Sequence, residues 1–391
     1  MPDGNYPTIL FVQSFLEHPR GGIGQYESQM FHRLSQVKNI ELYIPKIRAI
    51  KIPRIFHKFF FVNVKAFAEN NPFWINIPKR RSVIVHLSHQ FMGIAIPITK
   101  IRGLFSQSKP RIVITVHDLY DLETYQNPLL RNFQPNWRWA DKLANKMMLM
   151  GIGFADHVIV DSYATKEFVV RVIPKMRKKI SVIHLGWDGL DGEEPRRNLN
   201  RRKPRQILYV GSLHPRKNVL TLVNAISLLR RQAYDVNLIL AGALRTSSVP
   251  REIISTDGVV VLGEVTSAQI QELYESSSVF AFPSLSEGFG LPLIEAMGFG
   301  CPVVASDIPI FREIAGDAAV YVSPLDTEAW ATAIRTLLDD EYSRATLSQK
   351  GINIAKQYSW DTAFQETLAV YDKVTGQSHE NSLNNSIIKY R

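Results

Sequence analysis

The chain has 391 residues, of which 45% are hydrophobic and 21% charged, and its formal net charge is +10. This length exceeds one ordinary core and predicts two domains. No run of about 18 uncharged apolar residues occurs, so no segment is predicted to span a bilayer. The first residues, MPDGNYPTILFV, lack the pattern of a secretory signal. Because Cys301 is the only cysteine, a disulfide within the chain is excluded, and we expect a reducing, cytoplasmic setting.

Positive charge is concentrated in the first half of the chain. Residues 1–200 carry 28 Lys and Arg against 16 Asp and Glu, whereas the remainder carries 18 against 20. Residues 46–111 alone contain 13 basic residues and one acid, Glu69, together with many aromatic residues. Mixed cations and aromatic rings favour an anionic partner, either a membrane or a nucleic acid.

Apolar runs typical of buried strands alternate with helical patterns along most of the chain, which predicts parallel sheets covered on both faces. In the first half we expect strands at 8–13, 82–87, 111–117 and 157–161, and helices at 23–35 and 163–173. In the second half we expect strands at 206–212, 236–242, 258–263, 279–284, 301–306 and 318–324, and helices at 341–357 and 360–374. The fold class predicted is α/β, with two Rossmann-like, doubly wound domains that face a central cleft.

A polar segment, GWDGLDGEEPRRNLNRRKPR, separates the two series of strands and has the composition of an exposed linker. The predicted division has these parts: an N-terminal domain 1–187, a linker 188–205, a C-terminal domain 206–360, a helix 361–376 that packs back toward the N-terminal domain, and a disordered tail 377–391.

The segment SEGFGLPLIEAMGFGCPVVAS, residues 286–306, places two glutamates in an apolar α/β context. We expect Glu287 in a loop at the carboxyl end of a strand and Glu295 about one turn into a helix that begins near Pro292. The glycines at 288 and 290 allow a ligand to approach main-chain N–H groups. Helix N-termini favour phosphate, and carboxylates accept hydrogen bonds from hydroxyls. The pattern predicts a ligand with both groups, such as a nucleotide sugar, although the glutamates could instead be a helix cap and a solvated helix residue.

A second motif, SLHPRKN, follows the strand at 206–212. Arg216 and Lys217 lie at a loop-to-helix junction at a strand end, where they could neutralise a diphosphate. The alternative is a solvated pair without a ligand. No D-x-D triplet occurs in the chain, so the two cations would compensate charge in place of a metal.

Polar residues also end strands in the first half. His117 and Asp118 follow RIVITV, and His86 and His89 lie in VHLSHQF, where they could line the acceptor side. A lone histidine is more often structural. Gly21 and Gly22, in PRGGIGQY, precede a helix but do not form a dinucleotide fingerprint, because the glycines do not directly follow a strand.

These motifs resemble the retaining GT-B glycosyltransferases of the glycosyltransferase family 4 and glycogen-synthase-like group. The matching pieces are GGIG, TVHD, VGSLHPRKN, the E-x7-E segment and SDIPIFREIAGDAA, and the resemblance is loose between residues 45 and 110. It implies that Glu287 contacts the transferred sugar and Glu295 the ribose, while Arg216 and Lys217 bind the diphosphate. The other donor-side positions that it implies are Gly21, Gly22, Gly211, Val265, Gly288, Phe289, Gly290 and Leu291, with His117 facing the sugar.

The resemblance further implies transfer of a hexose with retention, with no metal or cofactor beyond the donor. The expected donor is GDP- or UDP-linked, with a lean toward GDP-mannose, and the expected acceptor is a glycan or a polyprenyl or other lipid-linked molecule. Residues 46–67 are expected to contact an anionic membrane from the cytoplasmic side. No nucleic acid is expected. The open alternatives are a nucleotide-sugar epimerase of the same fold, a nucleic-acid-binding protein, and a nucleotide-sugar sensor without catalysis.

Overall fold

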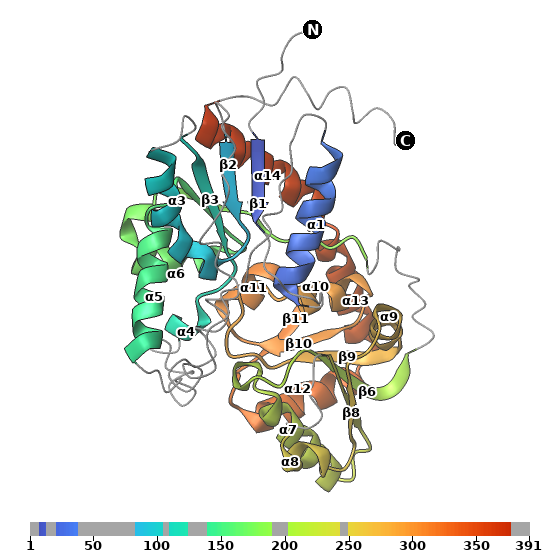
Figure 1. Cartoon of the computed structure of the whole chain (residues 1–391). Coiled ribbons are helices and arrows are strands. Elements are labelled where there is room, and N and C mark those ends of the chain that lie inside the picture. The colour runs from blue at the N-terminus through green and yellow to red at the C-terminus, as the bar shows by residue number, and fades with distance from the viewer. Residues whose placement is uncertain are drawn as a thin grey trace, which may run out of the picture. The chain divides into compact units, whose positions relative to one another are not determined.

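The structure is a computed structural model, and it describes residues 8–12, 21–37, 83–104, 109–123, 139–189, 202–242 and 249–376. The chain divides into two compact units, coloured along the chain in Figure 1. The first unit comprises residues 1–119, 135–184 and 360–391. The second comprises residues 120–134 and 185–359.

The first unit is built on a five-stranded parallel sheet in the order β1-β2-β3-β4-β5. Its strands are β1 (Thr8–Val12), β2 (Val83–Leu87), β3 (Arg111–Val116), β4 (His157–Val160) and β5 (Ile180–Val182). Its helices are α1 (Gly22–Gln36), η2 (Gln90–Ile94), α3 (Ala95–Leu104), α5 (Trp139–Ile152), α6 (Tyr163–Val172), η4 (Pro174–Met176) and α14 (Trp360–Thr375). The strands are short runs of β-branched and aliphatic residues that are almost entirely buried, as a sheet covered on both faces requires.

The last helix, α14, belongs to the first unit although it follows the second unit in sequence. It packs against α1, β3 and β4, and the Tyr371 hydroxyl lies 2.6 Å from His86 Nδ1 on β2. Arg33 of α1 pairs with Asp361 at 2.7 Å. The chain end therefore returns to the N-terminal sheet, in the place where the sequence predicts a returning helix.

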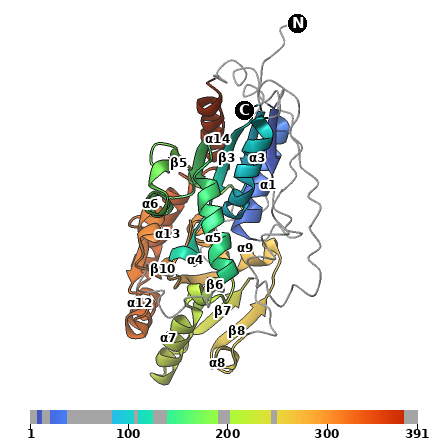
Figure 2. The same cartoon turned by 60° about the vertical axis from the view of Figure 1, so that its left-hand side comes forward.

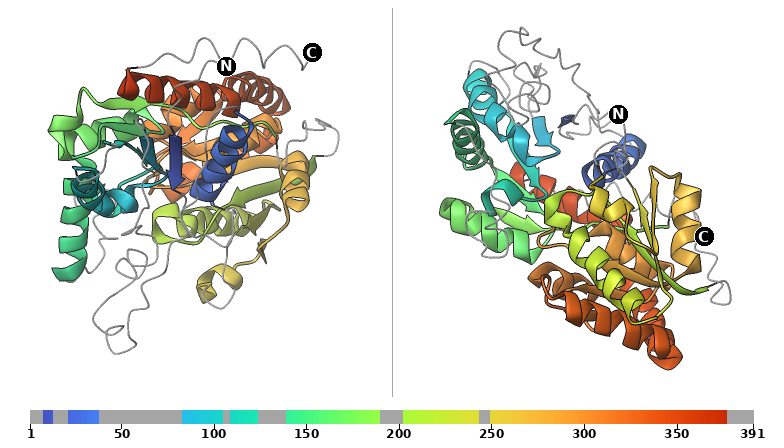
Figure 3. Two further views of the ribbon diagram at one scale, coloured as in Figure 1. Left: turned by 45° about the horizontal axis from the view of Figure 1, so that its top comes forward. Right: turned by 90° about the horizontal axis from the view of Figure 1, so that it is seen from below.

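The second unit holds a six-stranded parallel sheet in the order β11-β10-β9-β6-β7-β8. Its strands are β6 (Lys203–Val210), β7 (Asn237–Ala241), β8 (Val259–Gly263), β9 (Ser277–Phe282), β10 (Val303–Ser306) and β11 (Ala319–Val322). Its helices are α4 (Tyr120–Glu123), η6 (Pro215–Lys217), α7 (Val219–Arg231), α8 (Arg251–Ile254), α9 (Ser267–Ser276), α10 (Leu291–Gly298), α11 (Pro309–Ala315), α12 (Thr327–Asp339) and α13 (Glu341–Ala355). Figures 2 and 3 show these helices flanking the strands from further directions.

The order of this sheet fixes where a ligand can bind. The chain starts in the middle at β6, builds outward through β7 and β8, and then returns to the other side of β6 with β9. The direction of winding reverses between β6 and β9, which creates the topological switch point at which doubly wound sheets bind ligands. The loops that leave these two strands carry both motifs singled out in the second half of the sequence.

The predicted strands are confirmed, each within a few residues at its ends. The division differs from the prediction in three places. Residues 120–134 belong to the second unit, that unit resumes at residue 185 rather than after residue 187, and β6 begins at Lys203, inside the segment predicted as linker. The membrane stretch 46–67 and the tail 377–391 lie outside the described residues, and the central cleft stays a prediction.

Candidate active site

The loop after β6 is shaped by a short turn that presents two cations. His214 caps η6 by accepting a hydrogen bond from the Arg216 N–H at its Nδ1. Asn218 then adopts a left-handed backbone with φ +52°, and its side-chain amide donates to the carbonyls of Pro283 and Pro324, at 3.1 and 2.7 Å. Asn218 thus ties the turn to the ends of β9 and β11, and α7 begins at the next residue.

The loop after β9 is held directly against this turn. The N–H of Leu285 donates to the carbonyl of Arg216 at 2.8 Å. Glu287 follows in the same loop, as predicted, and its side chain is only 7% exposed. The two loops leave the two strands of the switch point, so their contact follows from the strand order.

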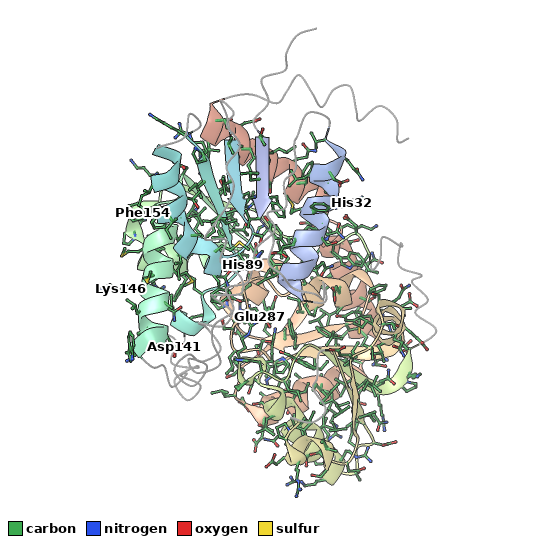
Figure 4. All side chains as sticks on the ribbon, viewed as in Figure 1. His32, His89, Asp141, Lys146, Phe154 and Glu287 are labelled. Atoms are coloured by element: carbon green, nitrogen blue, oxygen red, sulfur yellow. The ribbon has the colours of Figure 1, made fainter. Side chains whose placement is uncertain are left out.

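Glu287, which is labelled in Figure 4, forms the centre of an ion cluster with both predicted phosphate-binding cations, Arg216 and Lys217. Its Oε1 accepts hydrogen bonds from the Lys217 ammonium and from Ser284 Oγ, the latter at 2.7 Å. Its Oε2 lies 3.6 Å from Arg216 Nη1. Lys217 Nζ also lies 5.4 Å from the centroid of the Phe282 ring, within the range of a cation–π interaction.

Glu287 is ionised in this setting. Burial by itself raises the pKa of this carboxyl, but the charges of Lys217 and Arg216 and the hydrogen bonds from Lys217 and Ser284 outweigh burial, and the net pKa is lowered. The ion cluster itself holds two cations and one carboxylate, and a second carboxylate, that of Glu123, accepts a hydrogen bond from the neighbouring Ser286 Oγ at 2.5 Å. A carboxylate has about four acceptor positions, so Oε2 can still accept a hydroxyl.

Glu295, the second predicted glutamate, has different surroundings. It lies on α10, is 8% exposed, and its Oε2 accepts a hydrogen bond from the Tyr274 hydroxyl at 3.0 Å. Burial raises the pKa of Glu295 to about 7, against the effect of that hydrogen bond. The burial of Glu295 excludes the alternative that it is a solvated helix residue, while the prediction that both glutamates meet one ligand stays a prediction.

The glycines of the motif serve the backbone geometry. Gly290 has φ +96° and caps α10 without any side-chain hydrogen bond, and Pro292 lies in the first turn, as predicted. Phe289 is buried and packs edge-on against Tyr358. Pro292 has no N–H, and the Leu293 N–H donates to the Gly290 carbonyl at 2.9 Å, so Leu291 supplies the N–H in this first turn that could bind an anion.

Gly211 and Val265 follow the carboxyl ends of β6 and β8. Gly211 has φ +154°, and a Cβ at this position would come within 2.7 Å of the Tyr209 hydroxyl. Val265 lies half-buried between β8 and the capping residue of α9, Thr266. Both positions lie at the carboxyl edge of the sheet that carries the ion cluster, because all six strands run parallel.

His117, in the first unit, forms a buried pair with Asp161. Its Nδ1 lies 2.6 Å from Asp161 Oδ2, and its Nε2 lies 3.0 Å from the Ser88 carbonyl, to which it must donate. Burial lowers the pKa of His117, but the charge of Asp161 and the hydrogen bond to it outweigh burial and raise the pKa. Both ring nitrogens have protein partners and the residue is 6% exposed, so this geometry supports a structural role. Its predicted contact with the sugar stays a prediction.

The remaining first-unit candidates differ in exposure. His89 is 3% exposed, and burial together with the charge of His117 lowers its pKa to about 3, so it is neutral and has little surface for an acceptor. Asp118 is half-buried and accepts a hydrogen bond from Gln90 at 3.4 Å. Gly21 and Gly22 are exposed at the start of α1, and a Cβ at Gly21 would meet no atom within 4 Å.

Sequence reasoning missed four residues that shape these sites: Ser284, Asn218, Tyr274 and Asp161. Two of them carried a signal. Asn218 directly follows the two cations and precedes a helix, a position that suits a left-handed residue. Asp161 ends the strand next to the one that ends at His117, so the parallel sheet brings their ends together. Ser284 and Tyr274 carried none, because their contacts depend on side-chain packing.

Comparisons with known proteins agree with this architecture. A model described as Glycosyltransferase Family 4 matches residues 33–189, and one described as Glycosyl transferases group 1 matches residues 191–354. The O-antigen chain mannosyltransferase RfbU of Salmonella typhimurium is 26% identical over 275 residues, 68% of this chain and 74% of that protein. The O-antigen chain mannosyltransferase B of Escherichia coli is 35% identical over 172 residues, which cover 42% of this chain and 45% of that protein.

Solved structures share the fold. Sucrose-phosphate synthase from Thermosynechococcus elongatus aligns with a TM-score of 0.67 at 21% identity, over 95% of this chain and all of that one (100%). Anabaena HepE in complex with UDP aligns with a TM-score of 0.65 at 17% identity, over 94% of this chain and 100% of that chain. The two family models follow one another along the chain, and the structural neighbours contain both of its parallel-sheet domains. The chain therefore belongs to the glycosyltransferase family 4 group of GT-B glycosyltransferases.

Proposed function

We propose that this enzyme transfers a hexose, mannose in the first instance, from a nucleotide sugar to a glycan or lipid-linked acceptor, with retention of configuration and without a metal. The observation that supports it most strongly is the cluster of Arg216, Lys217 and Glu287 at the switch point of the second sheet. The site combines cations suited to a diphosphate with a carboxylate suited to sugar hydroxyls.

The proposed chemistry follows from the charges. Breaking the bond between sugar and phosphate develops negative charge on the nucleotide diphosphate and positive charge on the sugar ring. Arg216 and Lys217 would stabilise the first, since fixed cations need no reorganisation when the charge develops. Glu287 would hold both cations in place and accept a hydroxyl of the sugar, and Glu295 would accept hydroxyls of the ribose.

Mannose as the transferred sugar rests on the relatives. RfbU and the mannosyltransferase B of Escherichia coli are named as O-antigen chain mannosyltransferases. A third relative, from Mycolicibacterium smegmatis, is named phosphatidyl-myo-inositol mannosyltransferase. It is 30% identical over 180 residues, which cover 45% of this chain and 47% of that protein. For this chain we therefore propose GDP-mannose as the first donor to test, followed by UDP-linked sugars. The lipid- or glycan-linked acceptors would be met at the cytoplasmic face of a membrane. Among the helices of the described residues, none is both long and apolar enough to cross a bilayer.

Donor screening tests the proposal. Thermal unfolding of the purified chain is followed with GDP-mannose, UDP-glucose and other nucleotide sugars, and a donor at 100 times its Kd adds about 2.7 kcal/mol of stability. The donor that binds is then incubated with and without glycan acceptors, in the presence of a chelator, and the anomeric configuration of the product is read by NMR. Release of a rearranged sugar without acceptor would instead identify an epimerase. No shift with any donor would contradict the proposal.

A further inference from the structure

The outer side of α5 exposes a stripe of large apolar side chains. Its members are Trp139, Leu143, Met147, Met150 and Phe154, and their exposed fractions lie between 43% and 77%. The four members on the helix follow one another at intervals of three or four residues, so they share one face of α5, and Phe154 continues the stripe just after the helix ends at Ile152. With a rise of about 1.5 Å per residue, the helical part from Trp139 to Met150 is roughly 17 Å long. In Figures 1 and 2, α5 lies on the outside of the first unit.

The opposite side of α5 is fixed against η2, so the stripe cannot turn inward. A Cβ placed on Gly151 would come within 1.9 Å of the Gly93 carbonyl oxygen, and one on Gly93 would come within 2.8 Å of the Ile152 side chain. Met148 and Ile152 are buried on this side. The close backbone approach requires glycine at both positions and sets the rotation of the helix about its axis.

Cations border the stripe along its length and at its end. Lys142 and Lys146 are exposed beside it, whereas Asp141 on the same helix is buried, and Figure 4 labels Lys146 and Phe154 along the outer side. Lys175 Nζ lies 4.5 Å from the centroid of the Phe154 ring. In sequence, Lys175 belongs to a run of exposed basic residues in α6, η4 and the following turn: Arg171, Lys175, Arg177, Lys178 and Lys179.

This combination suits an anionic bilayer better than a protein partner. Helices that lie in a membrane interface carry large apolar residues on one face and lysine or arginine beside them. Protein interfaces are depleted in lysine, yet most of the cations here are lysines. Lys142, Lys146 and Lys175 are all exposed, where they can reach lipid phosphates.

We propose that the stripe of α5 inserts into the interface of an anionic phospholipid bilayer, with the bordering cations on lipid phosphates. The residues of this surface are other than 46–67, and the proposal does not depend on the sugar that the enzyme transfers. It assigns to the first unit a membrane-binding face of its own, at a depth of about 5–10 Å in the headgroup region.

Co-sedimentation with vesicles tests this face on the full chain. Vesicles of phosphatidylcholine are compared with vesicles that also contain phosphatidylglycerol, using wild type, Leu143→Ser, Met150→Ser, Lys142→Gln and Lys146→Gln. Each apolar substitution should weaken binding about tenfold, and each lysine substitution about fivefold, on the anionic vesicles only. The matched controls are Ile254→Ser and Lys356→Gln, at exposed positions of the second unit, the first of them 57% exposed. Both should bind as wild type does.

Thermal unfolding midpoints equal to wild type would show that the exposed substitutions leave the fold intact. Three results would overturn the proposal: wild type that stays in solution with anionic vesicles, α5 variants that sediment as wild type does, or controls that lose binding equally. A wild type that self-associates without lipid, through a contact that Met150→Ser abolishes, would assign the stripe to a second copy of the chain and overturn it too.

Discussion

Lys217 and Glu287 lie 70 residues apart in sequence and form one buried hydrogen-bonded ion pair at the switch point of the second sheet. The sequence assigned the cation to a diphosphate and the carboxylate to a sugar. In the structure the carboxylate also positions the cation, so the two predicted roles are coupled. A substitution at either residue should therefore disturb both donor phosphate binding and sugar binding.

Removal of a cation at this site should slow the reaction. We expect Arg216→Ala and Lys217→Ala each to lower kcat by about 10²–10³, because each removes a fixed charge that stabilises the leaving group. Steady-state rates with the identified donor measure this, and Arg231→Ala, on the exposed end of α7, is the control. Wild-type turnover in either variant would contradict the assignment.

Glu287→Gln should alter the dependence of stability on pH. The folded state lowers the pKa of Glu287, so its charge stabilises the fold above the unfolded pKa, and this contribution disappears as the pH falls below the ordinary value of 4.5. We expect the variant to be less stable by about 2 kcal/mol near neutral pH. This difference in the free energy of unfolding should shrink in acid. Urea unfolding of wild type and Glu287→Gln, at neutral pH and at a pH below 4.5, measures it. An equal difference at both would mean that Glu287 is not ionised in the fold.

Glu295 should change the stability of the fold with pH in the opposite direction to Glu287. Its folded pKa, about 7, lies above its ordinary value of 4.5, so the fold holds a proton that the unfolded chain releases. Wild-type stability should therefore fall, relative to Glu295→Gln, as the pH rises between these values. If ribose hydroxyls donate to Glu295, nucleotide binding favours the charged carboxylate and should strengthen as the pH rises through about 7. Calorimetry of nucleotide binding checks this, and the same pH dependence in Glu295→Gln would refute the ribose contact.

Asn218 should be needed for the stability of the cationic turn. Asn218→Gly keeps the left-handed backbone but loses the bonds to Pro283 and Pro324, at a cost of about 2 kcal/mol. Asn218→Ala loses the same bonds and adds a backbone penalty, so its cost should be about 3 kcal/mol. Urea unfolding of the two variants separates the contributions. Equal stability of Asn218→Ala and wild type would show that the turn does not depend on this side chain.

His117→Ala should destabilise the first unit, because it leaves Asp161 as a buried carboxylate without its partner. Such losses cost about 3–5 kcal/mol. A His117 that acts only on the sugar predicts a different result, namely an unchanged unfolding midpoint with a reduced kcat. Thermal unfolding and kinetics of the same variant distinguish the two roles.

The strand positions and the site loops could be predicted because they depend on local sequence. Runs such as QILYV and VFAF are rich in aliphatic and aromatic residues, and glycine, proline and serine bound them. The sequence therefore predicts both that these segments are strands and where the strands end. The placement of Arg216 and Glu287 at strand ends followed from those limits and from the parallel topology. The start of β6 was misplaced because its first residues, Lys203 to Arg205, are exposed and polar.

The partners of the site side chains could not be predicted in the same way. The bond from Tyr274 to Glu295 joins two helices, and the Glu295 pKa depends on burial that no local pattern reports. The family resemblance assigned His117 to the sugar, and its position at a strand end agreed with that role, yet Asp161 on the neighbouring strand and the Ser88 carbonyl occupy both ring nitrogens. Strand-end position identifies residues at the correct edge of a sheet, but it does not tell which of them the fold itself uses.

A crystal structure of the enzyme with GDP-mannose would test the central claim most directly. We predict that the diphosphate lies at the carboxyl ends of β6 and β9, with its oxygens within hydrogen-bonding distance of the side chains of Arg216 and Lys217 and the mannose beside Glu287. A nucleotide bound elsewhere, with the Lys217–Glu287 pair unchanged and no phosphate beside it, would contradict the account.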